Sequence, residues 1–317
     1  MRPAPRLLLA VPVVLGLGLG CAPGPEAEAE VRPLEVPAGC PQYANPVKQG
    51  TVNHRALNEV SGLVASRTQP GVLWVHNDSG DRPRVFALAT DGAHLGEYRL
   101  AEANAIDWED IALGPGPEAG VDYLYLGDIG DNFRVRPAIQ IYRIREPEVP
   151  TAPGQAGRTH EVTQVERFRL RYPDGAHNAE TLLVDPTDGA LYIVTKEEEG
   201  PSRLYRAPSL RTGESTQLEY LGDVALPRSM APGSHLVTAG DVAPDGRAIL
   251  LRTYSTAFLY RRTTGTPLPG ALAGSACPVP LALELQGEVI GFGGEDGRYL
   301  TTSEKRGQPI WVFVPEG

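Results

Sequence analysis

The chain has 317 residues, of which 41% are hydrophobic, so it is long enough to bury a large core in one domain or two. Charged residues make up only 21%, whereas Gly (36) and Pro (30) are frequent, which favours an all-β fold of short strands over long helices. The formal net charge of −10 argues against nucleic acid as a partner.

The first twenty residues have the pattern of an export signal. Arg2 and Arg6 precede an apolar run over residues 7–19, and Gly20 then precedes Cys21. The run is too short to serve as a membrane-spanning helix of the mature chain. The segment resembles a bacterial lipoprotein signal, which implies that Cys21 is lipidated and becomes the N-terminus. Gly18 stands where that family usually has Leu, so a plain cleaved signal is the alternative.

Residues 21–39 are rich in Pro, Gly, Ala and Glu and predict a flexible tether. We therefore expect an export signal over residues 1–20, the tether, and one domain over residues 40–317. The expected location is the cell envelope, with membrane contact through the N-terminal lipid only. The alternative is a soluble periplasmic or secreted protein.

Cys40 and Cys277 are the two remaining cysteines. In an exported chain such a pair predicts a disulfide rather than a metal site. Two unpaired buried thiols are the alternative.

An internal repeat sets the expected fold. Each repeat begins with a polar residue and an apolar strand, at Ser61-Gly-Leu-Val, Glu109-Asp-Ile-Ala, Glu180-Thr-Leu-Leu, Thr238-Ala-Gly-Asp-Val and Glu288-Val-Ile-Gly. A turn, a second apolar strand and a third strand that usually carries an aromatic residue follow each time. Outer fourth strands are expected at residues 96–100, 167–170, 217–220 and 281–285. The fifth repeat reaches the end of the chain without one.

An N-terminal strand within residues 47–56 can supply the missing outer strand and close the ring. The sequence thus predicts a five-bladed β-propeller, which is expected to be a monomer. A six-bladed propeller and a β-sandwich are the alternatives. On this register Cys40 and Cys277 both lie just before an outer strand, where a disulfide would reinforce the seam between the last two blades.

Two sets of polar residues are expected at one end of the central tunnel, because the first strand of a blade begins where the second strand ends. The strand starts supply Ser61, Glu109, Glu180, Thr238 or Asp241, and Glu288. The strand ends supply Asn77, Asp78, Asp128, Asp131, Asn132, Lys196, Glu197, Arg252 and Glu304.

Three glutamates on a narrow axis repel one another unless a cation, protons or basic side chains compensate them. Carboxylate and hydroxyl oxygens in number are the ligands of a hard cation such as Ca²⁺. A central calcium is therefore one interpretation. The alternative is a polar ring bonded to backbone or to Lys196 and Arg252. The loops around Asp78, Asp107 and Asp131 are dense in oxygen donors, which fits either a second cation or Asx turns that stabilise the loops.

The runs Trp-Val-His-Asn-Asp-Ser-Gly-Asp81, Asp107-Trp-Glu-Asp-Ile-Ala and Gly127-Asp-Ile-Gly-Asp-Asn resemble a family of exported bacterial propeller proteins of unsettled function. The likeness covers most of the mature chain. More distantly, one acidic or hydroxyl residue per inner strand resembles the calcium-activated nucleotidases (apyrases), and the general scheme resembles phytase-like and esterase-like propellers. That resemblance implies calcium ligands at Ser61, Glu109, Glu180, Thr238 and Glu288.

The enzyme hypothesis is calcium-assisted hydrolysis of a small anionic or ester substrate. Lys196 and Arg252 would hold its negative group, and Glu109 or Asp128 would act as the base. The binding hypothesis makes the same face a recognition surface for a glycan, peptide or envelope partner, with Trp108, His76 and Phe133 as contacts. A purely structural envelope protein is the third. The sequence contains no Gly-x-Ser-x-Gly elbow, phosphate-binding P-loop or His-Glu-x-x-His motif.

Overall fold

The computed structural model describes residues 36–316, apart from residues 153, 225, 228 and 230. The predicted export signal, the lipidation site Cys21 and most of the tether lie outside the described residues. No helix among the residues described has the length and apolar character needed to cross a membrane.

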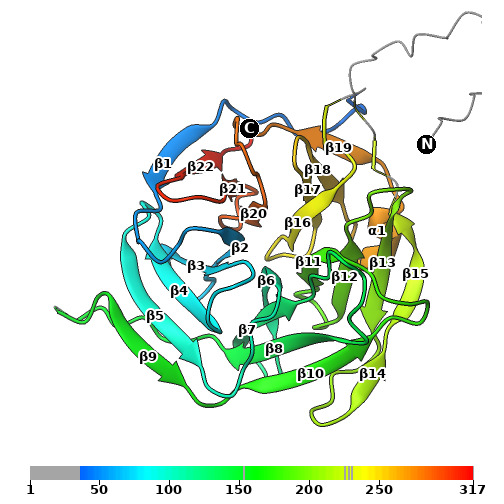
Figure 1. Ribbon diagram of the computed structural model, residues 1–317. Helices are drawn as coiled ribbons and strands as arrows, with labels where there is room; N and C mark the ends of the chain where they lie inside the picture. The colour runs from blue at the N-terminus through cyan, green and yellow to red at the C-terminus, as the bar shows by residue number, and fades with distance from the viewer. Residues whose placement is uncertain (1–35, 153, 225, 228, 230, 317) are drawn as a thin grey trace, which may run out of the picture. The chain divides into compact units, whose positions relative to one another are not determined.

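The described chain is almost entirely β-structure, and Figure 1 shows its sheets arranged around a central axis. Blade 1 contains, in spatial order, β2 (Val60–Ala65), β3 (Val72–Asn77), β4 (Arg84–Ala89), β5 (His94–Leu100) and β9 (Arg158–Val162). Blade 2 contains β6 (Trp108–Pro115), β7 (Asp122–Asp128), β8 (Ile139–Arg145), β10 (Glu166–Arg171) and β14 (Ser215–Gln217). Blade 3 contains β11 (Ala179–Val184), β12 (Leu191–Thr195), β13 (Ser202–Ala207) and β15 (Glu219–Val224).

Blade 4 contains β16 (Val237–Val242), β17 (Ala248–Thr253), β18 (Ala257–Arg261) and β19 (Ala276–Val279), with the short helix α1 (Leu268–Leu272) before β19. Blade 5 contains β20 (Val289–Phe292), β21 (Tyr299–Thr302), β22 (Pro309–Phe313) and the N-terminal β1 (Val47–Thr51). The prediction of a five-bladed β-propeller is confirmed, and the six-bladed and sandwich alternatives are wrong.

The hydrophobic core lies between the blades. Buried apolar side chains form one cluster at each of the five seams between neighbouring blades. Every residue of β3 and β12 is buried, because adjacent blades cover both faces of these strands. Strands that are buried on both faces have continuous apolar sequences, so the second strand of each repeat is clearly marked in the sequence.

The N-terminal strand closes the ring as predicted. β1 pairs antiparallel with β22, and Val47 lies opposite Val312. The strand ends at Thr51, which is earlier than the expected limit of residue 56.

Two expected outer strands are wrong in position. In blade 4 the outer strand is β19, and residues 281–285 form a connection to blade 5 in which Leu283 and Leu285 are exposed. The expected strand at residues 217–220 is divided at Leu218, so that β14 pairs parallel with β10 and β15 completes blade 3. The sequence also gave no indication of β9, which adds a parallel fifth strand to blade 1.

Cys40 and Cys277 form the predicted disulfide, with their Cα atoms 5.4 Å apart. Cys277 lies within β19, so the expectation that both cysteines precede an outer strand is wrong for this one. Both residues belong to the cluster between blades 4 and 5. The disulfide therefore links the N-terminal segment to the blade next to the closure.

We expect replacement of both cysteines by Ser to lower the free energy of unfolding by about 2–5 kcal/mol, because the crosslink closes a very long loop of the unfolded chain. Urea unfolding of the double variant measures this. Wild-type protein in reductant should unfold at the same urea concentration as the variant, and a variant as stable as oxidised wild type would contradict the prediction.

Candidate functional site

A β-bulge at the start of each of four inner strands aims one polar side chain differently from its neighbours. The pairing of β2 with β3 skips Ser61, and the equivalent pairings in blades 2, 3 and 4 skip Glu109, Glu180 and Thr238. An extra residue of this kind is left out of the ladder and its side chain is re-aimed. Glu288 directly precedes β20 in blade 5. The fourth ring position is therefore Thr238 and not Asp241.

The hydroxyls of the ring join neighbouring blades. Ser61 Oγ donates to the carbonyl of Glu109 at 2.6 Å, and Thr238 Oγ1 donates to the carbonyl of Gly287 at 3.1 Å. Asp241 lies further along its strand, where its carboxylate accepts the N–H groups of Val242 and Phe292, both at 2.8 Å. Burial raises the pKa of Asp241 to about 6. The structure does not bring Ser61 or Asp241 into the group of carboxylates described next.

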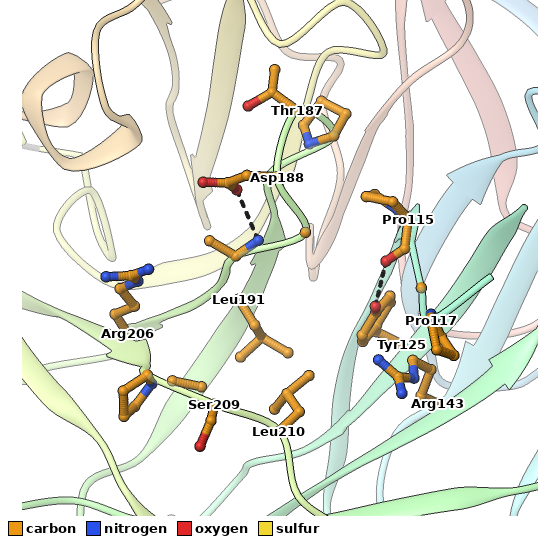
Figure 2. Close-up of a pocket in the computed structure, with 16 residues that line it drawn as sticks. Pro115, Pro117, Tyr125, Arg143, Thr187, Asp188, Leu191, Arg206, Ser209 and Leu210 are labelled. Carbon is orange, nitrogen blue, oxygen red and sulfur yellow. Dashed lines mark hydrogen bonds between the residues drawn. The ribbon is translucent and has the colours of Figure 1, made fainter. Parts of the chain in front are cut away.

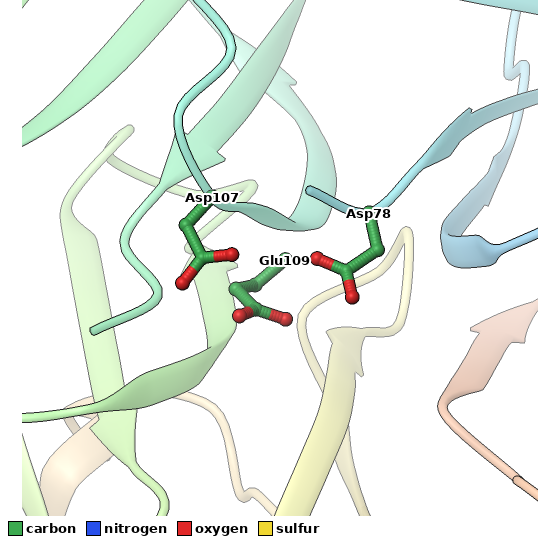
Figure 3. A group of neighbouring side chains, drawn as sticks. All are labelled: Asp78, Asp107 and Glu109. Atoms are coloured by element: carbon green, nitrogen blue, oxygen red, sulfur yellow. The ribbon is translucent and has the colours of Figure 1, made fainter. Parts of the chain in front are cut away.

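Three carboxylates converge at the polar end of the tunnel, as Figure 3 shows. Oxygens of Asp78, Asp107 and Glu109 lie within 4.8 Å of one another, and we call these residues the carboxylate cluster. Asp78 follows β3, Asp107 precedes β6, and Glu109 occupies the bulge of β6. Two blades therefore supply the cluster.

Glu109 is only 4% exposed, and no described residue donates a hydrogen bond or forms an ion pair with its carboxylate. Burial raises its pKa well above the usual value, and the charges of Glu180, Asp78 and Asp107 raise it further. Burial likewise raises the pKa of Asp107, and raises that of Asp78 to about 6. The Ser79 N–H bonds to Asp78, and the charges of Arg136 and Lys196 lower the pKa of Asp107 against the effect of burial. The cluster thus brings three carboxylates together, and Glu109 is the member without such a partner among the described residues.

The backbone of Gly130 forms one wall of the cluster. Its N–H donates to the carbonyl of Asp107 at 3.2 Å, and a Cβ at this position would overlap Glu109 Oε1 and Asp107 Oδ2. The loop must therefore carry glycine here if the carboxylates are to keep this arrangement.

Replacement of Gly130 by Ala is expected to weaken cation binding at the cluster by at least about tenfold, because the methyl group displaces two carboxylates. The measurement is a calcium titration by calorimetry. Gly294→Ala, where the nearest atom to the added Cβ is 3.7 Å away, is the control. Equal affinities of the two variants would contradict the prediction.

In blade 3, which packs against blade 2, Lys196 compensates Glu180. The Lys196 ammonium donates to Glu180 Oε1 at 2.5 Å and to the hydroxyl of Tyr254 at 2.6 Å. Burial alone would lower the pKa of Lys196, but these two contacts raise it. Burial raises the pKa of Glu180 to about 7 against the lowering effect of Lys196.

Glu288 and Glu304 form a carboxyl pair beside this group. Burial, the hydrogen bond with Glu304 and the charge of Glu180 raise the pKa of Glu288 to about 9. The pair therefore holds a proton near neutral pH.

The predicted loop residues make hydrogen bonds around the polar end of the tunnel, which we call the mouth. Asn77 accepts the N–H groups of Asn58 and Glu59 at 3.2 and 3.3 Å. Asp131 accepts those of Val135 and Arg136 at 3.0 and 2.7 Å, so it stabilises its own loop through residues four and five positions further along.

Asn132 and Asp128 belong to the same frame. Asn132 Oδ1 accepts a bond from Asn178 at 3.2 Å. Asp128 is fully buried and lies 2.8 Å from the guanidinium of Arg136, while it accepts the N–H of Asp107 at 3.1 Å. Its carboxylate is not placed to act as a base on a substrate.

Arg252 is fully buried and does not face the mouth. Its guanidinium forms an ion pair with Glu284 at 2.6 Å and donates to the carbonyl of Val289 at 2.8 Å. The structure therefore separates Arg252, which lies within β17, from Lys196, which directly follows β12.

The three residues proposed as contacts for a partner differ in their exposure to solvent. Trp108 and His76 are 1% and 0% exposed, so neither can touch a partner, whereas Phe133 is 87% exposed. Burial lowers the pKa of His76 to about 4. Sequence reasoning missed Tyr254 altogether and noted Asp107 only as part of an acidic run.

A separate pocket of about 510 Å³ lies where the inner strands of blades 2 and 3 end, away from the carboxylates. Figure 2 shows Pro115 and Pro117 on one side and Arg206, Ser209 and Leu210 on the other. It contains none of the predicted site residues, and we place the candidate site at the polar end.

No protein-family model and no curated protein matches the chain. Among solved structures, it is similar to a glucose dehydrogenase at 11% identity, with a TM-score of 0.45, over 86% of this chain and 99% of that one. It is also similar to a structure from Xanthomonas campestris described as a gluconolactonase important in glucose secondary metabolic pathways, at 14% identity and a TM-score of 0.42, over 90% of this chain and 98% of that one. Both likenesses are too distant to bear on function.

Proposed function

We propose that the polar end of the tunnel binds one Ca²⁺ through Asp78, Asp107 and Glu109, and that the protein hydrolyses a small anionic ester there. The observation that carries the proposal is Glu109, a carboxylate that is buried, unpaired among the described residues and directed at two further carboxylates. A buried charge without a partner is strongly unfavourable, so such a group requires a proton or a cation.

The donor set fits a hard cation. Ca²⁺ takes six to eight oxygen ligands, some of which are waters, and three carboxylates leave positions for waters and substrate oxygens. His and Cys, which softer metals prefer, are absent from the cluster. The two hydroxyls assigned from the resemblance, Ser61 and Thr238, are already engaged between blades.

A bound calcium would polarise an ester oxygen and favour ionisation of a coordinated water. The protein's own contribution comes from Lys196 and Glu180 of blade 3, which packs against blade 2. An ammonium has three donors, and Lys196 uses two of them on Glu180 and Tyr254, so the third can hold an anionic group. Glu180, which Lys196 fixes in place, can accept the proton of an attacking water.

We also propose that the chain is exported and that a lipid on Cys21 anchors it in the cell envelope. The leader pattern of residues 1–21 supports this proposal. A site on an exported domain would meet millimolar calcium outside the cytosol, which suits a weak extracellular-type cation site.

The second candidate function is binding without turnover. Phe133 and Val135 favour it, because they are 87% and 74% exposed on the loop that contains Gly130. Large apolar side chains that remain exposed beside a site are typical of a recognition surface.

The experiment is a hydrolysis panel of phosphoesters, nucleotides and carboxylic esters, each tested with calcium and with EDTA. The enzyme proposal predicts turnover that EDTA abolishes and that Glu109→Gln lowers by about 100-fold or more. Glu295→Gln, an exposed carboxylate beyond the far end of β20, is the matched control and should keep full activity. Saturable binding of a ligand without turnover would favour the second candidate, and activity unchanged in EDTA would contradict calcium-assisted hydrolysis.

A further inference from the structure

The loop over residues 129–138 carries exposed apolar side chains next to the carboxylate cluster. Phe133 and Val135 lie at its tip, and Ile106, which is 55% exposed, directly precedes Asp107. Gly130 contacts the cluster, and Phe133 follows three residues later, so it lies within about 10 Å of Gly130 along the chain.

The loop is held firmly in spite of its exposure. Asp131 accepts two N–H groups of the tip, and the Arg136 guanidinium donates to the carbonyl of Gly130 at 2.7 Å. Arg134 forms an ion pair with Glu197 at 3.1 Å. Because the apolar side chains are presented on an ordered loop, binding a ligand against them costs little conformational entropy.

A groove continues from this loop. It has a volume of about 380 Å³ and is lined by Val135, Pro137, Ala138, Tyr172 and Ala176 among others. The charged residues in its lining are two arginines, Arg136 and Arg171. Arg136 is already paired with Asp128, so Arg171 is the cation at the rim of the groove, and Val135, Pro137 and Ala138 supply an apolar wall for a chain.

We propose that the ligand of the tunnel mouth is an anionic amphiphile, with an oxyanion head at the carboxylate-bound cation and an apolar chain along Ile106, Phe133 and Val135 into this groove. The inference rests on the proposed function for the position of the head group. The apolar chain would cover side chains that are otherwise left in water.

The test uses methylphosphonate and octylphosphonate, which share a head group, cannot be hydrolysed as esters and differ only in chain length. Octyl glucoside supplies the same chain without charge. Calorimetry in the presence of calcium should give octylphosphonate an affinity at least about tenfold above that of methylphosphonate. Octyl glucoside should bind more weakly than octylphosphonate.

The double variant Phe133→Ser with Val135→Ser should lose this chain-length preference and keep the wild-type affinity for calcium. Tyr220→Ser, on the exposed edge strand β15, is the control and should keep the preference. Equal affinities for the two phosphonates, failure of both to bind, a preference that survives the double variant, or octyl glucoside bound as tightly as octylphosphonate would overturn the inference. Failure of the wild type to bind calcium would contradict the proposed function instead.

Discussion

Replacement of Glu109 by Gln is expected to reduce the calcium affinity of the protein by at least about 100-fold, because loss of outer partners of a metal site already weakens binding 10- to 100-fold and Glu109 is a direct ligand in this account. The amide keeps the shape of the side chain but not its charge. Its buried position should remain filled, so we expect the variant to fold. Calorimetric titration of EDTA-treated protein with calcium measures the effect.

Glu295→Gln is the matched control, since it removes one carboxylate at an exposed position past β20. It should bind calcium as the wild type does. If Glu109→Gln and Glu295→Gln bound calcium equally well, the cluster would not be the cation site.

The metal-free protein is expected to lose stability as the pH rises from about 6.5 to 9. The pKa of Glu288 is raised to about 9 and that of Glu109 well above its usual value, so the folded chain holds protons that the unfolded chain has released. Stability therefore falls with pH until these groups ionise. His76, whose pKa is lowered to about 4 by burial, has the opposite effect only below about pH 6.5.

Thermal unfolding in EDTA should show the melting temperature falling by at least about 5 °C over this interval. Calcium should reduce the fall, because it binds the ionised carboxylates and its affinity rises with pH. Glu288→Gln should flatten the curve in EDTA, and Glu295→Gln should not. A melting temperature that rises between pH 6.5 and 9 in EDTA would contradict this interpretation of the mouth.

The blades could be predicted because their second strands are covered on both faces, so each repeat shows an uninterrupted apolar run. Outer strands could not, because partial exposure weakens the pattern. Residues 281–285 alternate well enough to predict a strand, yet Glu284 turns inward to Arg252 and the segment becomes a connection. The true strand β19 has only four residues and includes Cys277 and Pro278.

The ring residues could be predicted from their repeated positions in the sequence. The side chains that they contact could not be predicted. A β-bulge adds one residue to a strand and reverses which side chains face inward, and nothing in the sequence marks it. The choice between Thr238 and Asp241 depended on such a bulge. Lys196 and Arg252 are basic residues at similar positions in their repeats. Only the structure shows that the Arg252 guanidinium forms an ion pair with the buried Glu284. Tyr254 was missed because its role exists only through Lys196, which lies on another blade.

The central claim is that the carboxylate cluster holds a cation. Elemental analysis of the purified mature protein, stripped with EDTA and then dialysed against calcium, tests it most directly. We expect one calcium per wild-type chain and per Glu295→Gln chain, and none in Glu109→Gln. A folded wild-type protein that retains no calcium, or a Glu109→Gln variant that retains as much as the wild type, would contradict it.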